Sequence, residues 1–354
     1  METTSGLHWG DPEKTGSAFD CRSDTVTPAS TSTFEAIRHA TLNDDVYGEG
    51  QTTTAFERQI AKACGKEAAV FVVSGTMANQ LALRALLPVA PHGVLADSRA
   101  HIVNFESGGL GLLSVAMVQA VNAANGRHLT LDDIVKRLVP MDAKIEKCPT
   151  SLRSIYKWSS AHHVPVHIDG ARLWNAVATG AARLDEFAAC CDALTLCFMK
   201  SIAAPIGAMV VGSADLVGRV RRLRQSIGGG VRQIGPMVAA ARQAVYENFG
   251  TGSIDERSTL SRAHEFAIRI GKFWKERGGE LLYPIETNMV WLDLKGAGVA
   301  TPEFNALGRK AGIRLAGPRI VTHGSLCEDA LHRLDQVFKD CLGDVAADNW
   351  RPRL

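Results

Sequence analysis

Three apolar stretches of strand length in this sequence of 354 residues each lead into side chains that can bind or react with a ligand. "AAVFVV" precedes Ser74, Gly75 and Thr76, "VPVHI" precedes Asp169, and "ALTLCFM" precedes Lys200. Free amides and hydroxyls at a strand-to-helix turn bind phosphate, because the positive end of the helix dipole lies there. A lysine held in a desolvated site has a depressed pKa, and its neutral amine can attack an aldehyde.

Each stretch also has an ordinary structural interpretation. The Ser-Gly-Thr turn can be a helix cap, Asp169 can cap a helix or pair with Arg172, and a lysine at a strand end usually extends into water. The three together are more specific, because pyridoxal phosphate needs a phosphate site, a carboxylate at its ring nitrogen and a lysine that forms an imine. The combination favours an enzyme that uses this cofactor.

Alternating strands and helices must position these residues. The runs "AAVFVV", "GVLAD", "VPVHIDG" and "ALTLCFMK" lack polar alternation and are separated by helical patterns, which is typical of a parallel sheet covered on both faces. Thr130 and Asp133 predict an acidic capping box at one helix start. In open parallel sheets, ligands bind at the carboxyl ends of the strands. We therefore predict an α/β fold with a mostly parallel central sheet.

The pattern changes from about residue 250. The short apolar runs "MVWLDL", "IRLAG" and "RIVTHG" surround the helical "PEFNALGRKAG", which predicts a smaller α+β domain. We expect a leader over residues 1–18, a large cofactor-binding domain over 19–250, a small domain over 251–345 and a tail over 346–354.

Composition narrows the class of protein. The formal net charge of +2 is too mild to indicate a nucleic-acid surface, and no segment approaches the roughly 18 apolar residues that span a bilayer. The 8 cysteines form no metal-type pair and accompany no secretory signal, which favours reduced thiols. We expect a soluble cytoplasmic protein that acts on a small molecule and binds no nucleic acid, membrane or metal ion.

Blocks along nearly the whole chain fall in the order of a known family. They read "CRSDTVTPAS", "NDDVYGEG", "GKEAAVFVVSGTMANQLAL", "HIVNFESGG", "VHIDGARLWNA", "LCFMKSIAAPIGA", "IGGGVRQIG", "ETNMVWLDL" and "RIVTHG". The sequence resembles the threonine aldolases, also called β-eliminating lyases, and is most similar to fungal members. The resemblance implies the aspartate aminotransferase-like fold (fold type I), with pyridoxal phosphate as the cofactor.

The resemblance also implies roles for single residues. Lys200 would hold the cofactor as a Schiff base, Asp169 would face its ring nitrogen, and His101 would stack on the ring as a third catalytic residue. The phosphate and the remaining cofactor contacts would be made by Ser74, Gly75, Thr76, Arg172 and Arg232.

For the substrate carboxylate, the resemblance implies Ser23, Arg172 and Arg319, with Tyr47 supplied by a neighbouring subunit of a homodimer or homotetramer. Two arginines suit a carboxylate because guanidinium binds it in a bidentate manner. Without the resemblance, His101 and Ser23 read as loop residues, Arg319 as an exposed charge and Tyr47 as a packing residue.

The implied reaction is the cleavage of L-threonine, L-allo-threonine or another 3-hydroxy amino acid to glycine and an aldehyde. A base takes the β-hydroxyl proton while the Cα–Cβ bond breaks. Two alternatives remain open, an alanine racemase of secondary metabolism and a degenerate member with weak activity.

Three departures from the family pattern motivate these alternatives. "KSIA", from Lys200 to Ala203, replaces a "KGLG" or "KGLC" pattern, so the side chain of Ser201 is costly if its backbone needs a positive φ. Gln225 stands where a lysine is usual, which would remove a cation near the phosphate. A strand and loop are missing before Ser151, which would leave neighbouring strands unpaired.

Overall fold

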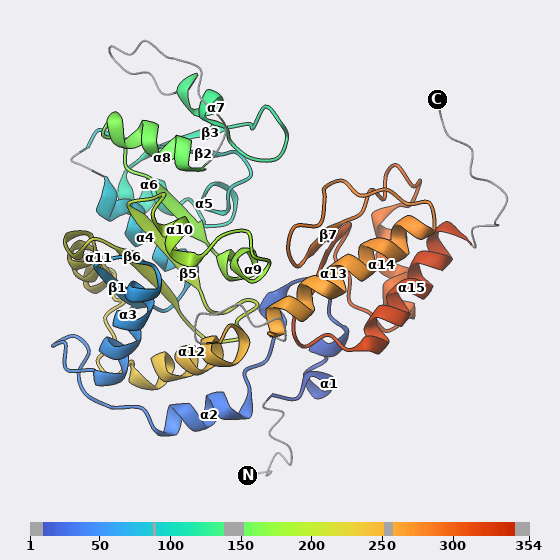
Figure 1. The fold of residues 1–354 in the computed structure, drawn as a ribbon, viewed down its shortest axis with the longest axis horizontal. Helices are drawn as coiled ribbons and strands as arrows, with labels where there is room; N and C mark the ends of the chain where they lie inside the picture. Colours follow the sequence, from blue (N-terminus) through green and yellow to red (C-terminus); the bar gives the residue numbers. More distant parts are fainter. Residues whose placement is uncertain (1–9, 88–89, 138–151, 251–257, 344–354) are drawn as a thin grey trace.

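A four-stranded sheet forms the centre of the larger of two lobes (Figure 1). The computed structural model describes residues 10–87, 90–137, 152–250 and 258–343. The strand order is β1 (Ala68–Val72), β6 (Ala208–Gly212), β5 (Ala193–Cys197) and β4 (His167–Gly170). β6 is antiparallel to β1 and β5, whereas β4 is parallel to β5. β1, β4 and β5 therefore run in one direction and end at the same edge.

Helices follow most strands, as the sequence predicts. In chain order they are α1 (Pro12–Thr15), α2 (Thr31–Arg38), α3 (Gln51–Ala63), α4 (Gly75–Leu86), α5 (His101–Asn104), α6 (Gly109–Ser114), α7 (Leu131–Val135), α8 (Leu152–Ala161), α9 (Leu173–Ala178), α10 (Leu184–Ala188), α11 (Ala214–Ser226), α12 (Gly235–Asn248), α13 (Thr259–Glu276), α14 (Thr301–Lys310) and α15 (Glu328–Leu342). Two short 3-10 turns, Ser17–Phe19 and Asp24–Val26, precede α2.

Both faces of the central sheet are buried. Alternate residues of β1 point to opposite sides, so Val70 and Val72 pack with α4 and α11. Ala69 and Phe71 pack on the other side with α3, α9 and α12. Every residue of β5 and β6 is buried. The uninterrupted apolar runs of the sequence reflect this burial on two faces, which confirms the predicted α/β architecture.

A separate two-stranded sheet pairs β2 (Gly93–Asp97) with β3 (Met117–Val121) in parallel. In the part of the chain that the structure describes, no backbone ladder joins this pair to β4. The sequence predicts that a strand is deleted before Ser151, and residues 138–151 lie outside the described residues. The loss of one strand is expected to separate its two neighbours, because neither then has a pairing partner. In the described residues, the β2–β3 pair and the four-stranded sheet are not joined by another strand.

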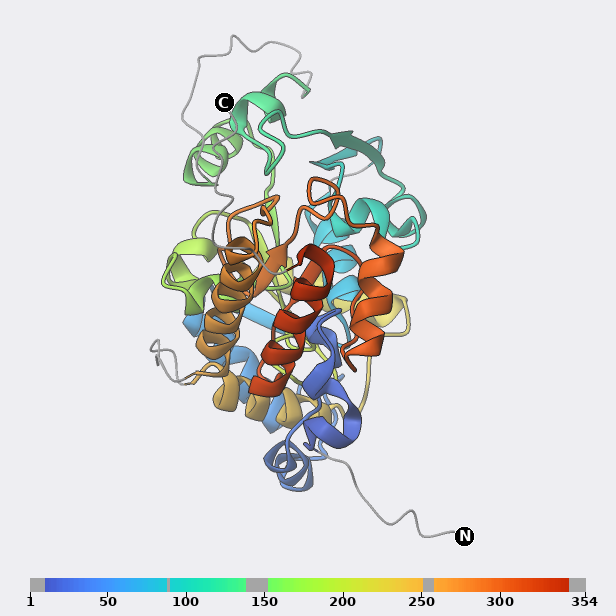
Figure 2. The ribbon, with the colours of Figure 1, turned by 90° about the vertical axis from the view of Figure 1, so that its right-hand side faces the viewer.

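The smaller lobe contains an antiparallel pair, β7 (Met289–Trp291) and β8 (Arg319–Val321), with α13, α14 and α15 (Figures 1 and 2). Its core includes Phe266, Trp274 and Phe338, and the early residue Cys21 packs into the same core. The sequence analysis assigns Cys21 to the large domain. The structure instead places it in the smaller lobe, because the Cys21 amide donates to the Arg314 carbonyl and its carbonyl accepts from Val321.

One local prediction is confirmed, because Thr130 and Asp133 form the reciprocal capping box of α7. "IRLAG" is not a strand, since only an isolated bridge joins Arg314 to Asp20. The domain boundary at 250/251 stays a prediction because it adjoins residues 251–257, which lie outside the described residues, as do 1–9 of the leader and the tail from 346. No described helix is both long and apolar enough to cross a bilayer.

Candidate active site

The predicted cofactor residues gather at the edge where β1, β4 and β5 end. Ser74 lies two residues beyond β1, Asp169 is the penultimate residue of β4, and Lys200 lies three residues beyond β5. A Cβ placed on Gly75 would lie 3.7 Å from Sγ of Cys197, so the first turn of α4 contacts the end of β5. The shared strand direction thus brings together three segments that are far apart in the sequence.

The start of α4 offers free hydrogen-bond donors. The Ser74 hydroxyl caps the helix by accepting a bond from the Met77 amide at 3.1 Å. The amides of Gly75 and Thr76 have no partner among the described residues. A Cβ on Gly229 would lie 3.0 Å from Cε of Met77, so the loop of residues 228–230 lies close to the first turn of α4. Two free amides at the positive end of a helix dipole form an anion site.

Asp169 presents a carboxylate that is anchored yet open. Its Oδ2 accepts a hydrogen bond from Asn79 Nδ2 at 2.9 Å, and its Oδ1 accepts one from the Ala171 amide at 3.0 Å. The residue is nevertheless exposed. The ordinary interpretation as an ion pair with Arg172 is wrong, because Arg172 binds Asp24 instead. The remaining lone pairs of Asp169 are free for a protonated ligand nitrogen.

A buried carboxylate, Glu106, connects Asp169 to His101 through Asn79. Glu106 Oε1 accepts bonds from Asn79 Nδ2 at 2.9 Å and from His101 Nδ1 at 2.8 Å. Its Oε2 accepts a bond from Gln80 Nε2 at 2.7 Å. Because a carboxylate only accepts, Nδ1 of His101 carries the proton and Nε2 is left as the acceptor nitrogen of the ring.

Asn79 and Glu106 are site residues that were not predicted from the sequence. Oδ1 of Asn79 also accepts bonds from Thr195 Oγ1 at 2.8 Å and from His167 Nε2 at 3.1 Å. One available signal was helical spacing, since Asn79 follows Gly75 by four residues and lies on the same face of α4. The other was the acidic residue inside "HIVNFESGG", where His101 and Glu106 are five positions apart.

The predicted carboxylate-binding residues meet around Asp24. Arg172 donates to Asp24 through Nε at 3.0 Å and Nη2 at 2.7 Å, which leaves Nη1 without a partner in the described ranges. Burial lowers the pKa of Arg319, and the nearby charge of Arg172 lowers it further against the attraction of Asp24. Ser23 caps the adjoining 3-10 turn, its Oγ accepting from the Thr25 amide. Nη2 of Arg319 donates to the Arg22 carbonyl at 3.3 Å, so the second guanidinium lies beside the segment that carries Ser23 and Asp24.

The loop after β5 holds Lys200 by its backbone. The Lys200 carbonyl accepts bonds from Thr27 Oγ1 at 2.9 Å and from the Ala203 amide at 2.8 Å. Its half-buried side chain makes no hydrogen bond or ion pair with any described residue. Ser201 has no positive φ, whereas Ala203 has a φ of 61°. The residue that would favour glycine is therefore Ala203.

Tyr47 and Arg232 lie apart from this group and contact each other. The Arg232 guanidinium lies 5.1 Å from the Tyr47 ring centroid, and its Nη1 donates to Asp44 at 3.0 Å. Tyr47 is 74% exposed. Gln225 stands where the family usually has a lysine. Its side chain lies so close to Gly230 that a Cβ on this glycine would collide with it. A role for Arg232 at the phosphate stays a prediction.

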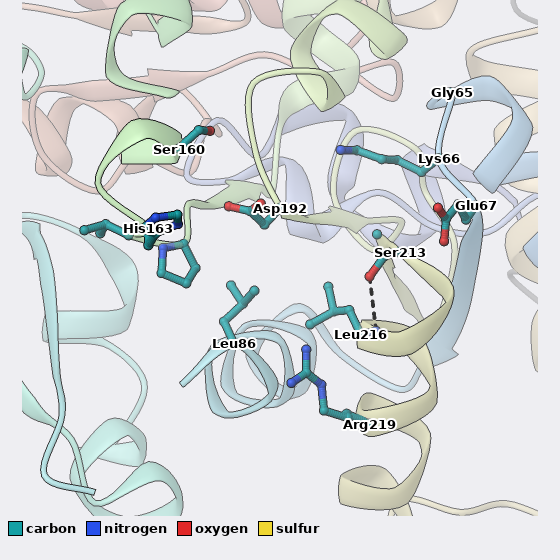
Figure 3. A pocket seen from close by; sticks show the side chains of 13 residues that line it. Gly65, Lys66, Glu67, Leu86, Ser160, His163, Asp192, Ser213, Leu216 and Arg219 are labelled. Carbon is teal, nitrogen blue, oxygen red and sulfur yellow. Dashed lines mark hydrogen bonds between the residues drawn. The ribbon is translucent and has the colours of Figure 1, made fainter. Parts of the chain in front are cut away.

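A hollow of about 610 Å³ lies at the opposite edge of the sheet, where β1, β4 and β5 begin (Figure 3). Its polar groups already have structural partners: Lys66 donates to the Cys191 carbonyl, and Asp192 accepts from the Val166 amide and the Tyr156 hydroxyl. Its lining residues are Gly65, Lys66, Glu67, Leu86, Ser160, His163, Val164, Pro165, Asp192, Gly212, Ser213, Leu216 and Arg219. None of the predicted site residues lines it.

The donor set at the carboxyl edge fits pyridoxal phosphate. The amides of Gly75 and Thr76 suit its phosphate, the exposed carboxylate of Asp169 suits its ring nitrogen, and the amine of Lys200, which has no partner among the residues described, suits its aldehyde. His101 adds an exposed aromatic ring that Glu106 holds in place.

Comparison with known proteins agrees with this geometry. The family model described as beta-eliminating lyase matches residues 20–152 and 147–297, two stretches that meet where the sequence predicts a deletion. Alanine racemase TOXG of Cochliobolus carbonum is 41% identical over 97% of this chain and 92% of its own. Aldolase vrtJ of Penicillium aethiopicum is 42% identical over 97% and 90%. A low-specificity L-threonine aldolase of Candida albicans is 36% identical over 94% and 92%.

Solved structures share the fold. A putative L-allo-threonine aldolase from Listeria monocytogenes superposes with a TM-score of 0.71 at 22% identity, covering 94% of this chain and 98% of its own. Leishmania major threonine aldolase gives 0.72 at 17% identity over 92% and 99%. The family match, the identities above 30% and the donor set at the strand ends together lead to one assignment. The chain belongs to the beta-eliminating lyase family and is a pyridoxal phosphate-dependent lyase with the fold type I architecture.

Proposed function

We propose that this enzyme cleaves 3-hydroxy amino acids, with L-threonine or L-allo-threonine as substrates, to glycine and an aldehyde. The proposal rests above all on one observation: Arg172 is bonded to Asp24, a carboxylate that also accepts a bond from Ser201, the residue after Lys200. Arg172, together with Arg319 at the Arg22 carbonyl, suits the carboxylate of an amino acid whose amine reaches Lys200. The similarity to aldolase vrtJ and to threonine aldolases at 34–36% identity supports the same class of reaction.

The chain's own groups can divide the work of this reaction. When bound, pyridoxal phosphate supplies an aldehyde that condenses with amines and a ring that accepts electrons. Asp169 holds a proton on the ring nitrogen, and the arginines orient the substrate by its carboxylate. His101, whose Nδ1–H is held by Glu106 at 2.8 Å, takes the β-hydroxyl proton on Nε2.

Racemisation of alanine is the second candidate, supported by the 41% identity to alanine racemase TOXG. It requires proton removal from Cα and return on the other face. Ser201 is not free to take part as a base, because its hydroxyl donates to Asp24 at 2.7 Å. The change beside Lys200 therefore adds no support to this candidate.

We also propose that the working unit is a homodimer or a larger homo-oligomer in which Tyr47 and Arg232 serve the site of a second copy. Both side chains are exposed, and neither is hydrogen-bonded to the groups around Lys200 in the described part of the chain. Two apolar side chains that precede Tyr47 in the sequence, Phe34 and Leu42, are also exposed.

One assay tests the reaction. The purified chain is supplied with pyridoxal phosphate and incubated with L-threonine, L-allo-threonine, L-phenylserine and L-alanine. Release of equal amounts of glycine and aldehyde is expected, and Arg319→Gln should raise KM whereas the exposed Arg309→Gln should not. D-alanine from L-alanine without aldehyde release would establish the racemase instead. A protein that binds the cofactor yet converts none of the four would contradict both candidates.

A further inference from the structure

Ser201, the residue after Lys200, carries a buried hydroxyl that the proposed reaction does not use. The residue is 3% exposed. Its Oγ lies 2.7 Å from Oδ2 of Asp24 and 3.3 Å from Nδ2 of Asn288. A carboxylate oxygen can only accept, and an amide nitrogen can only donate. The hydroxyl proton therefore points at Asp24.

Asp24 is a buried carboxylate whose partners come from distant parts of the chain. Oδ2 accepts from Ser201, from Asn288 at 3.3 Å and from Arg172 Nε at 3.0 Å. Oδ1 accepts from Arg172 Nη2 at 2.7 Å. Paired bonds to two carboxylate oxygens fix the plane of a guanidinium, so the orientation of Asp24 decides where the free Nη1 of Arg172 points.

Besides Arg172, the side chains of Ser201 and Asn288 bond to the Asp24 carboxylate and restrain its rotation. Asn288 is already committed to the Thr322 carbonyl at 2.8 Å, and its bond to Asp24 is long. The short bond from Ser201 is therefore the stronger restraint. A hydrogen bond to a charged group is also stronger than one between neutral groups.

We propose that Ser201 is a positioning residue that orients Arg172, through Asp24, to receive the carboxylate of the amino acid substrate. The hydroxyl belongs to the same loop as Lys200. Through Asp24 it therefore fixes the distance between Lys200, which binds the amine, and Arg172, which binds the carboxylate. The inference rests on the proposed function, because it takes an amino acid as the ligand. It is specific to the carboxylate and makes no demand on the cofactor or on the β-hydroxyl.

The test compares two ligands that differ only at the carboxylate. Glycine and glycinamide are titrated into the holoenzyme, and binding is followed by the change in the visible absorption of the cofactor, which needs no turnover. For Ser201→Ala, the dissociation constant of glycine should rise roughly tenfold, the effect of losing most of one charged hydrogen bond, while that of glycinamide stays unchanged. The matched control is Ser159→Ala in α8, whose buried hydroxyl donates to the Tyr156 carbonyl.

Ser201→Gly provides a second variant if the alanine variant does not fold. Equal weakening of glycine and glycinamide in these variants, or no change in either, would overturn the role of Ser201. Failure of the proposed function would give a different result. A wild-type protein that binds glycine more tightly than glycinamide, but releases no aldehyde from any 3-hydroxy amino acid, would contradict the proposed reaction and leave the role of Ser201 intact.

Discussion

Glu106, whose side chain is completely buried, accepts a hydrogen bond from Nδ1 of the exposed His101 at 2.8 Å. A buried carboxylate beside an imidazole fixes the tautomer and the ring orientation, and it stabilises the imidazolium that forms when Nε2 takes a proton. The same carboxylate binds Asn79, which in turn holds Asp169. Glu106 thus holds both His101 and, through Asn79, Asp169, the two groups on which the proposed chemistry depends.

Glu106→Gln should therefore lower kcat by roughly 10²-fold, the usual contribution of one general base, because the amide cannot stabilise a charged imidazole. KM should change much less, since the arginines remain in place. Steady-state rates with L-allo-threonine measure both constants. Glu303→Gln on the exposed side of α14 is the control. A Glu106→Gln variant with the kcat of wild type would exclude this role.

Asn79→Asp should destabilise the fold by at least about 2 kcal/mol, because it puts a third carboxylate between Glu106 and Asp169 and removes the donor that both require. Urea unfolding monitored by circular dichroism gives the free energy. Asn125→Asp is the matched change, since the exposed Asn125 acts through its acceptor oxygen, which aspartate retains. Equal stability of the two variants would count against the buried network.

Ala203→Gly should stabilise the protein by roughly 0.5–1 kcal/mol. Ala203 has a φ of 61°, where an L side chain is strained, and relief of that strain exceeds the entropy that glycine adds to the unfolded chain. Its neighbour Ala204 is buried and has no positive φ, so Ala204→Gly should lower stability. The midpoints of urea unfolding compare the two. A lower midpoint for Ala203→Gly would show that the loop tolerates alanine without strain.

Asp24 should make a contribution to the free energy of unfolding that is lost in acid. Burial alone would raise its pKa, but the Arg172 charge and the bonds from Arg172, Ser201 and Asn288 outweigh this and lower it below the ordinary 3.8. The folded state then binds fewer protons than the unfolded state, so the contribution is complete above about pH 4 and is lost as pH falls through the lowered value.

Asp24→Asn tests this sign. At pH 7 the variant should be less stable by roughly 3–5 kcal/mol, since the half-buried Arg172 loses its charged partner, and the gap should narrow below about pH 4. Unfolding free energies between pH 3 and 7 show the trend. Asp215→Asn, at an exposed ion pair of α11, should change stability little at any pH. A gap that stays constant down to pH 3 would contradict the lowered pKa.

A mixture of two inactive variants tests whether Tyr47 of one subunit serves the active site of another. Lys200→Ala lacks the reactive amine, and Tyr47→Ala lacks the exposed ring. If Tyr47 serves a second copy, mixed dimers contain one intact site, and activity should recover to about a quarter of wild type when subunits exchange at random. Light scattering fixes the oligomeric state of the same samples. No recovery from a mixture shown to contain mixed dimers would place Tyr47 in its own site.

Local patterns were enough to predict the strand ends that carry Ser74, Asp169 and Lys200. The length of each apolar run, the helix start after it and the rule for parallel sheets need no long-range information. β6 could not be assigned a direction in the same way, because all its residues are buried and its apolar run resembles those of parallel strands. Only pairing with β1 and β5 makes it antiparallel.

The connections between site residues were not predictable from the sequence. Asn79 and Glu106 are 27 positions apart, and Asp24 and Arg172 are 148 apart, so neither contact leaves a periodic signal. A polar residue on a helix is normally solvated, which is why Asn79 did not stand out. Cys21 joins the core of the smaller lobe for a similar reason, since its partners Arg314 and Val321 follow by almost the whole chain.

The division of the sheet between β4 and β2 has a mechanical consequence. His101 follows the β2 strand, and no backbone ladder within the described ranges joins β2 to the strand that bears Asp169. The link described here passes through the side chains of Asn79 and Glu106, together with helix contacts between α4 and α6. Among the described residues, the position of the imidazole relative to Asp169 therefore depends on a few side-chain bonds and on helix packing instead of a continuous sheet.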